Sequence, residues 1–128
     1  MSAIEGTPEP TEAKSNGTLS RDLARAMVAL YKEYVGRGPT RARAYIEDDL
    51  IVVVLQDTMT KAEETLAEED EADLVRGVRR VFQGKFREDA VEIVERQTGR
   101  DVLAFLSDHA IDPDVAIEAF VLTPQDEV

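Results

Sequence analysis

The most informative absence in this 128-residue sequence is cysteine, which does not occur at all. Without it the chain can form no disulfide bond, thiol nucleophile or cysteine-ligated metal site. Long apolar runs are also missing, so no segment has the length that a membrane-spanning helix needs. The N-terminus lacks the basic and then apolar layout of a signal peptide. We therefore expect a cytoplasmic protein that is not inserted in a membrane.

Basic residues are scarce as well: 15 lysines and arginines stand against 27 aspartates and glutamates, a formal net charge of −12. Binding to nucleic acid is disfavoured, because neutralising phosphates requires a surplus of basic residues. The same charge disfavours contact with an anionic membrane surface. The remaining composition, 43% hydrophobic and 33% charged, is typical of one soluble globular domain.

The two ends of the chain differ in composition from its middle. Residues 1–17 contain glycine and proline and almost no apolar side chains, so they cannot bury enough surface to offset the entropy cost of ordering. We predict a disordered N-terminal tail over 1–17, a single folded domain over 18–123 and a short acidic tail over 124–128.

The folded part is predicted to begin with a helix. Apolar residues recur every three or four positions from Leu19 to Tyr34, which is the spacing of one helical face. Thr18 or Ser20 can cap its start, and Gly36 can end it in the left-handed conformation.

A β-hairpin is predicted next, with a two-residue turn at Asp48-Asp49. This register gives the hairpin one unbroken apolar side, made of Ala42, Ala44, Ile46, Ile51, Val53 and Leu55. The other side is mixed, and its apolar members are Tyr45, Leu50, Val52 and Val54. An exposed apolar patch usually marks an interface, so we predict a homodimer contact there. Cover by the N-terminal tail or by a short helix near Leu66 is the alternative.

Two further helices are predicted between residues 60 and 97. Thr60 and Glu63 have the spacing of a capping box, so a short helix is expected to start after Thr60. A long helix follows from about Glu71 to Gln97. Its predicted buried stripe comprises Leu74, Val78, Phe82, Phe86, Ala90, Ile93 or Val94 and Gln97, and it is widened by Val75, Val81 and Val91. The acidic cluster over 63–73 is interpreted as a solvated surface, because the ligand spacing of a calcium loop is missing.

The chain is predicted to close with a second hairpin: a strand over 102–106, a loop over 107–114 and a strand over 115–122. Both strands are apolar on two faces, which favours the centre of a sheet. The order of elements predicts an α+β fold. In it, two helix–hairpin units form a four-stranded antiparallel sheet with the helices packed on one face.

Two groups of residues could carry chemistry. An arginine face on the long helix comprises Arg76, Arg79, Arg80 and Arg87. Such a face can bind a small anion or an acidic partner, although a solvated face paired with the acidic cluster is the favoured interpretation. His109 and its neighbouring aspartates could bind a metal or supply a base, but these residues also suit a hairpin loop, which is favoured. No nucleophile elbow or phosphate-binding loop occurs, so we expect no catalytic residue, metal or cofactor.

Several short motifs, taken together, resemble the YbcI-like or MpsC-like family of bacterial proteins. They are Tyr34-Val35-Gly36-Arg37-Gly38-Pro39, Ala44-Tyr45, Asp49-Leu50, Thr60-x-x-Glu63 with Leu66, Val78-Arg79 with Phe82, Gly99, Phe105-Leu106-Ser107-Asp108, Asp112-Pro113-Asp114 and Glu118-x-Phe120-Val121-Leu122. The resemblance covers about residues 18–123. It implies a small member of a Na+-translocating membrane-potential-generating system, related to bicarbonate and ion uptake, with no recognised catalytic residues.

The expected function is therefore that of a non-catalytic cytoplasmic binding or accessory protein. We expect a homodimer that associates with a membrane ion or bicarbonate transport system, with a transporter subunit as its partner. The alternative is a regulatory domain that binds a small anion through the arginine face.

Overall fold

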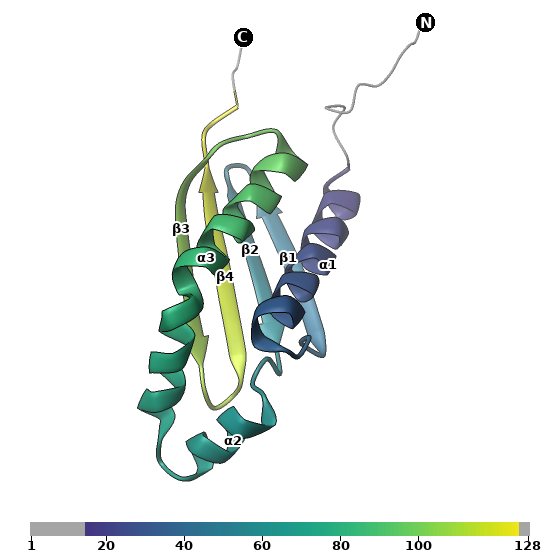
Figure 1. The fold of residues 1–128 in the computed structure, drawn as a ribbon. Coiled ribbons are helices and arrows are strands. Elements are labelled where there is room, and N and C mark those ends of the chain that lie inside the picture. Colours follow the sequence, from purple (N-terminus) through teal and green to yellow (C-terminus); the bar gives the residue numbers. More distant parts are fainter. Residues whose placement is uncertain (1–14, 126–128) are drawn as a thin grey trace, which may run out of the picture.

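Within residues 15–125, the part that the computed structural model describes, the chain forms three helices and four strands. Their bounds are α1 Asn16–Val35, β1 Arg41–Glu47, β2 Leu50–Gln56, α2 Lys61–Glu68, α3 Ala72–Thr98, β3 Val102–Ala110 and β4 Val115–Leu122. The strands form one antiparallel sheet in the order β1-β2-β4-β3, and α1 and α3 lie on the same face of it (Figure 1). The predicted α+β fold of two helix–hairpin units is confirmed.

Helix α1 begins earlier than the sequence predicted. Ser15 is its N-cap and accepts a hydrogen bond from the backbone N–H of Thr18, so neither Thr18 nor Ser20 caps the helix. The cap and first turn therefore occupy 15–17, which the composition had assigned to the tail. The rest of the two predicted tails, apart from 124–125, lies outside the described residues.

Both long helices end at a glycine in the left-handed backbone region. Gly36 has a φ of 87° and ends α1, and Gly99 has a φ of 70° and ends α3. A side chain with a Cβ is strained in this region, so glycine is the residue that closes a helix there. In both units the glycine is followed within a few residues by the first strand of a hairpin.

The first hairpin has the predicted register. The chain reverses at Asp48, whose φ is 51°, and Tyr45 pairs with Val52. The side chains that face the helices form part of the core and are at most 7% exposed: Ala44, Ile51, Val53 and Leu55. The unbroken apolar side of this hairpin therefore faces the helices, as the sequence predicted.

The second hairpin differs from the prediction in two ways. Residues 107–110 belong to β3 and not to a loop, because Ser107 pairs with Glu118 and the pairing continues to Ala110. The sequence predicted a loop here because these residues are mostly polar, and polar side chains fit this strand because one of its sides faces water. In addition, both strands of this hairpin were expected in the centre of the sheet, but of the two only β4 lies there. Strand β3 is an edge strand, and its register with β4 is interrupted by an irregularity between Val102 and Ala104.

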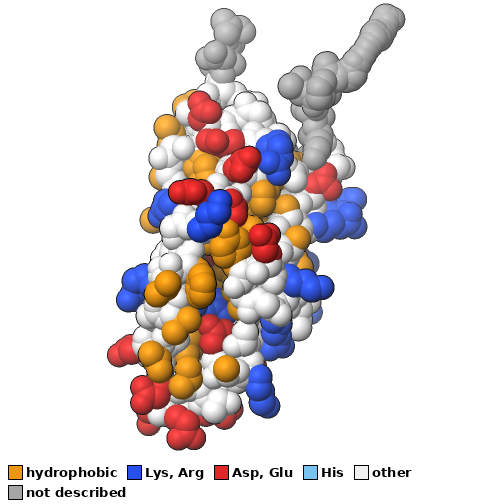
Figure 2. All heavy atoms as spheres, viewed as in Figure 1, with side chains coloured by type: hydrophobic (Ala, Val, Ile, Leu, Met, Phe, Trp, Pro, Cys, Tyr) orange, Lys and Arg blue, Asp and Glu red, His pale blue; other side chains and the backbone are white. Residues whose placement is uncertain are grey.

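Helix α3 packs on the sheet with its second half alone. That half is buried through Phe86, Ala90 and Val94. Of the predicted buried residues in the first half, Val75 is fully buried, but the prediction is wrong for Leu74, Val78, Phe82 and Val81, which are 49%, 43%, 49% and 78% exposed. The first half of α3 lies beside α2 at the end of the sheet (Figure 1), and hydrophobic side chains reach the surface there (Figure 2). A cavity opens between this half-helix and the strands.

Candidate functional site

Glu118 of β4 is the one charged side chain that is fully buried within residues 15–125. The hydroxyl of Tyr31 on α1 donates a hydrogen bond to its Oε2, and its Oε1 has no hydrogen-bond partner within the same range. Burial raises the pKa of Glu118 to about 7, although the nearby Ser107 side chain, the hydrogen bond from Tyr31 and the charge of Arg79 act in the opposite direction. The carboxyl group therefore changes its charge near neutral pH.

A second polar cluster lies where β2 ends and β4 begins. Asp114 accepts hydrogen bonds from the Met59 N–H at 2.8 Å and from the Thr58 hydroxyl at 3.1 Å. His109 Nε2 lies 2.9 Å from Asp114 Oδ1. Burial acts to raise the pKa of Asp114, but these hydrogen bonds outweigh it and hold the pKa below its usual value. His109 is thus a strand residue held by a neighbouring carboxylate.

The same corner was the candidate metal site in the sequence. Of the aspartates near His109, only Asp114 is hydrogen-bonded to the imidazole ring. In the part of the chain that the structure describes, no three His, Asp or Glu side chains are grouped so that they could hold a metal ion. The acidic residues of 63–73 form no such group either.

Two of the four arginines of the predicted face are held by other parts of the protein. Arg79 binds Glu63 through two nitrogens, at 2.8 and 2.9 Å, and donates to the Thr58 carbonyl at 3.0 Å. Arg87 lies over the ring of Phe105, 4.9 Å from its centroid. The structure therefore does not bring all four guanidinium groups together.

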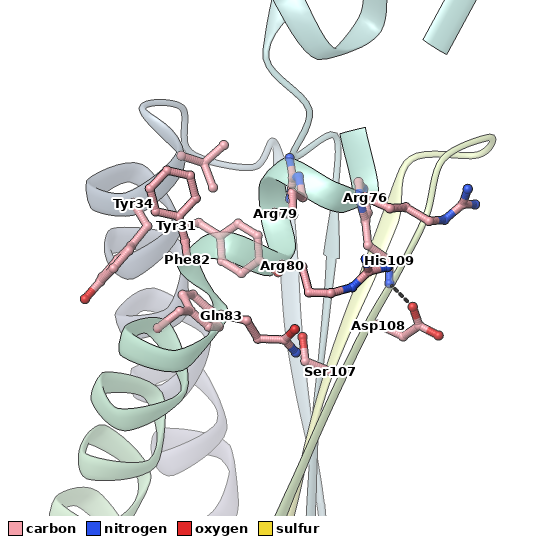
Figure 3. A pocket seen from close by; sticks show the side chains of 12 residues that line it. Tyr31, Tyr34, Arg76, Arg79, Arg80, Phe82, Gln83, Ser107, Asp108 and His109 are labelled. Atoms are coloured by element: carbon pink, nitrogen blue, oxygen red, sulfur yellow. Dashed lines mark hydrogen bonds between the residues drawn. The ribbon is translucent and has the colours of Figure 1, made fainter. Parts of the chain in front are cut away.

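The other two arginines, Arg76 and Arg80, line the cavity beside the first half of α3, which has a volume of about 160 Å³. The end of α1 and the second half of β3 complete its wall. In Figure 3, Tyr34 and Phe82 lie on one side of this space, and Arg80 extends from α3 toward β3 on the other. The cavity thus joins an apolar surface to a basic one.

The sheet face that is turned away from the helices is covered by no helix or strand of residues 15–125. Cross-strand pairing arranges its side chains in rows, and the central row is Tyr45, Val52, Ala119 and Leu106. The flanking rows are Glu47, Leu50, Val121 and Ala104 on one side, and Arg43, Val54, Ile117 and Asp108 on the other. Tyr45 is 53% exposed and Leu106 is 60% exposed. We call these twelve residues the open face.

The predicted interface residues Tyr45, Leu50, Val52 and Val54 are four of the six open-face residues that the first hairpin contributes, and Arg43 and Glu47 are the other two. The structure adds the second hairpin, which sequence reasoning did not connect with them. The alternation of Ile117, Ala119 and Val121 with the buried side of β4 was the available signal. Of the predicted alternatives, helix α2 packs against α3 and leaves the open face uncovered.

Sequence reasoning also missed the buried Tyr31–Glu118 pair. Tyr31 was counted only as an apolar member of the first helix. Glu118 gave a signal that went unused, because it is the one charged residue inside the apolar strand over 115–122. A charge in a strand that is apolar on both sides predicts a buried ionisable group.

These features define a class: an α+β protein whose four-stranded antiparallel sheet is covered by helices on one face and open on the other. Within that class, the chain belongs to the MpsC family. The family model described as "Na+-translocating membrane potential-generating system (MpsC)" matches residues 15–124, which confirms the resemblance seen in the sequence. Neither a curated protein nor a solved structure matches the chain significantly. No helix within residues 15–125 is both long enough and apolar enough to cross a membrane.

Proposed function

We propose that this chain is a non-catalytic, cytoplasmic accessory protein that acts as a homodimer in association with a membrane ion or bicarbonate transport system. The family description supports the link to a Na+-translocating system. The observation that carries the self-association is the open face, which presents apolar side chains from all four strands. Two such faces can pack together about 10 Å apart, as in a β-sandwich.

Charges at the two ends of one row make the open face complementary to itself. Arg43 on β1 and Asp108 on β3 are the end members of the row that contains Val54 and Ile117. A two-fold axis parallel to the strands lays β1 of one protomer over β3 of its partner at the same height. Each Arg43 then meets an Asp108 of the other copy, which closes the assembly as a dimer.

The role of the two unusual ionisable side chains supports a non-catalytic function. Glu118 is fully buried, so its carboxylate has no contact with solvent or with a ligand from solvent. His109 is held by Asp114 and is 12% exposed. The hydroxyl nearest to the His109 ring in hydrogen-bond distance is that of Thr58, at 3.3 Å from Nε2, and Thr58 is fully buried, so a substrate from solvent does not reach it.

The dimer is tested by placing a charge in the middle of the open face. We expect Val52→Glu to convert a wild-type dimer into a folded monomer, as measured by light scattering after size exclusion, with circular dichroism as the check on folding. Val81→Glu is the matched control, because Val81 is 78% exposed on α3, away from the open face. A monomeric wild type, or a dimer that survives Val52→Glu, refutes the proposal.

The orientation of the two protomers is tested by exchanging charges. Arg43→Asp and Asp108→Arg should each weaken the dimer, since each places like charges opposite one another. The double variant should restore the dimer, because the exchange recreates the pair. Sedimentation equilibrium over a range of concentrations measures this. If the double variant is as weak as the sum of the single variants, the two-fold axis is not parallel to the strands.

The association with transport is tested in the source organism. Deletion of the gene should reduce the Na+-dependent membrane potential, and the wild-type chain should restore it. Val52→Glu should fail to restore it if the dimer is the active form. An unchanged membrane potential in the deletion strain refutes the accessory role.

A second candidate function is a regulatory domain that binds a small anion. It is favoured by Arg76 and Arg80, which both line the cavity and leave their guanidinium groups exposed. Acetate and inorganic phosphate should then raise the melting temperature of the wild type, and this gain should vanish in the Arg76→Ala, Arg80→Ala variant. If neither these anions nor a larger carboxylate stabilises the wild type, this candidate is wrong.

A further inference from the structure

The cavity beside the first half of α3 has one wall of aromatic rings. Tyr31 and Tyr34 pack edge-on against Phe86, with centroid distances of 5.2 and 5.8 Å. Phe82, which is 49% exposed, extends this wall toward solvent. Rings fixed in this way offer a flat apolar surface to a bound molecule at little entropy cost, because they are already held in place by one another.

The opposite wall is polar, with Arg80 reaching across it and Arg76 at its rim, where the Arg76 guanidinium group is directed away from the aromatic wall (Figure 3). Both Arg80 and Gln83 extend from α3 toward β3, Arg80 toward His109 and Gln83 toward Ser107 (Figure 3). Arg80 has no ion pair within residues 15–125. Arg76 has only a 3.5 Å contact with Asp73, whose carboxylate is fully exposed to solvent. Exposed pairs of this kind contribute little, so both groups can turn to a ligand.

The charge of the lining favours an anion. Three arginines border the cavity, and Asp108 borders it through β3 while its side chain lies on the open face, whereas the whole chain has a formal net charge of −12. Even with Arg79 neutralised by Glu63, a positive surplus remains at this place. A cationic ligand would meet two guanidinium groups and is therefore disfavoured.

The size of the cavity limits the ligand. Its volume is about 160 Å³, and an apolar cavity of about 150 Å³ in another protein holds one benzene molecule. We propose that this cavity binds a small carboxylic acid with an aromatic or branched apolar body. Its carboxylate contacts Arg76 and Arg80, and its body lies against Tyr34 and Phe82. The proposal rests on the second candidate function and names the class of ligand.

Four probes separate the two parts of such a ligand. Benzoate has both parts, acetate has the carboxylate alone, benzyl alcohol has the ring without the charge, and phosphate is an anion without an apolar body. In NMR titrations of the full chain, we expect benzoate to bind at least about ten-fold more tightly than the other three. Equal binding of benzoate and acetate, or no saturable binding of benzoate, overturns the proposal.

Variants assign the binding to this cavity. Arg80→Gln should weaken benzoate about ten-fold and leave benzyl alcohol unchanged, because only the charge is lost. Phe82→Ala should weaken benzoate and leave phosphate unchanged. Both side chains are exposed, so the fold is retained, and circular dichroism verifies this. Arg87→Gln is the control, because Arg87 lies over Phe105 outside the cavity and should bind benzoate like the wild type.

The same titrations distinguish failure of the ligand class from failure of anion binding. If acetate and phosphate bind as tightly as benzoate and need Arg80, the chain binds anions but the proposed class of ligand is wrong. If no anion binds, the proposal and the second candidate function are both wrong. Benzoate binding that survives the Arg76→Gln, Arg80→Gln double variant also overturns the proposal.

Discussion

Replacement of the buried Glu118 by glutamine should remove a large part of the pH dependence of stability. In the folded protein the pKa of this carboxyl group is raised from 4.5 to about 7, chiefly by burial. As the pH rises from 4.5 to 7, the unfolded chain releases this proton while the folded protein keeps it. Since the folded state binds more protons over this interval, the free energy of unfolding falls as the pH rises.

The size of this effect follows from the shift. A change of 2.5 pKa units corresponds to about 3 kcal/mol, because one unit corresponds to about 1.4 kcal/mol. Glu118→Gln has no charge to titrate, and its amide oxygen can still accept the hydrogen bond from Tyr31. The difference in unfolding free energy between variant and wild type should therefore shift by about 2 to 3 kcal/mol in favour of the variant between pH 5 and pH 8, because a small part of the effect lies below pH 5.

Urea unfolding followed by circular dichroism at pH 5, 6, 7 and 8 measures this difference. Equal protein concentration in all samples keeps any contribution of dimerisation the same. Glu88→Gln is the matched control, because the same substitution at an exposed position of α3 should give a difference that stays constant to within about 0.5 kcal/mol. Parallel curves for the wild type and Glu118→Gln would show that the buried carboxyl group is ionised at all these pH values, contrary to the reasoning.

Two further substitutions test how the helices are held. Thr60→Ala removes the capping box of α2 and should lower the unfolding free energy by about 1 kcal/mol in urea titrations, whereas the neighbouring exposed Lys61→Ala should change it little. Phe86→Ala removes the ring between two tyrosines and should cost about 3 to 5 kcal/mol. On the same helix, Val81→Ala, at a side chain that is 78% exposed, should stay within about 0.5 kcal/mol of the wild type. Similar losses for Phe86→Ala and Val81→Ala would contradict the assignment of Phe86 to the core and of Val81 to the surface.

Features that depend on a few neighbouring residues could be predicted from the sequence. The turn at Asp48-Asp49 sets the register of the first hairpin, and the capping box at Thr60 sets the start of α2. Gly36 ends α1 because its left-handed backbone is a local requirement. Such signals involve residues at most a few positions apart, so they can be recognised in the sequence without knowing the fold.

Features that depend on distant partners could not be predicted in the same way. The spacing of Leu74, Val78 and Phe82 defines a helical face, but it does not say whether another element covers that face. Residues 107–110 form a strand because β4 lies beside them, and their own composition is that of a loop. The cavity combines side chains of α1, α3 and β3. The arginines and His109 among them stood out in the sequence, but as two separate groups, and nothing in the sequence placed them beside one cavity.

The irregular register of β3 has a consequence for how the chain behaves in concentrated solution. An edge strand exposes backbone groups that can recruit further strands, and a long straight apolar edge promotes fibre growth. The interruption between Val102 and Ala104 breaks the regular spacing of those groups along β3. At the other edge of the sheet, β1 carries Arg41, Arg43 and Glu47. Both edge strands thus disfavour the addition of further strands. Self-association of the chain is then expected through side-chain packing on the sheet face and not through its edges.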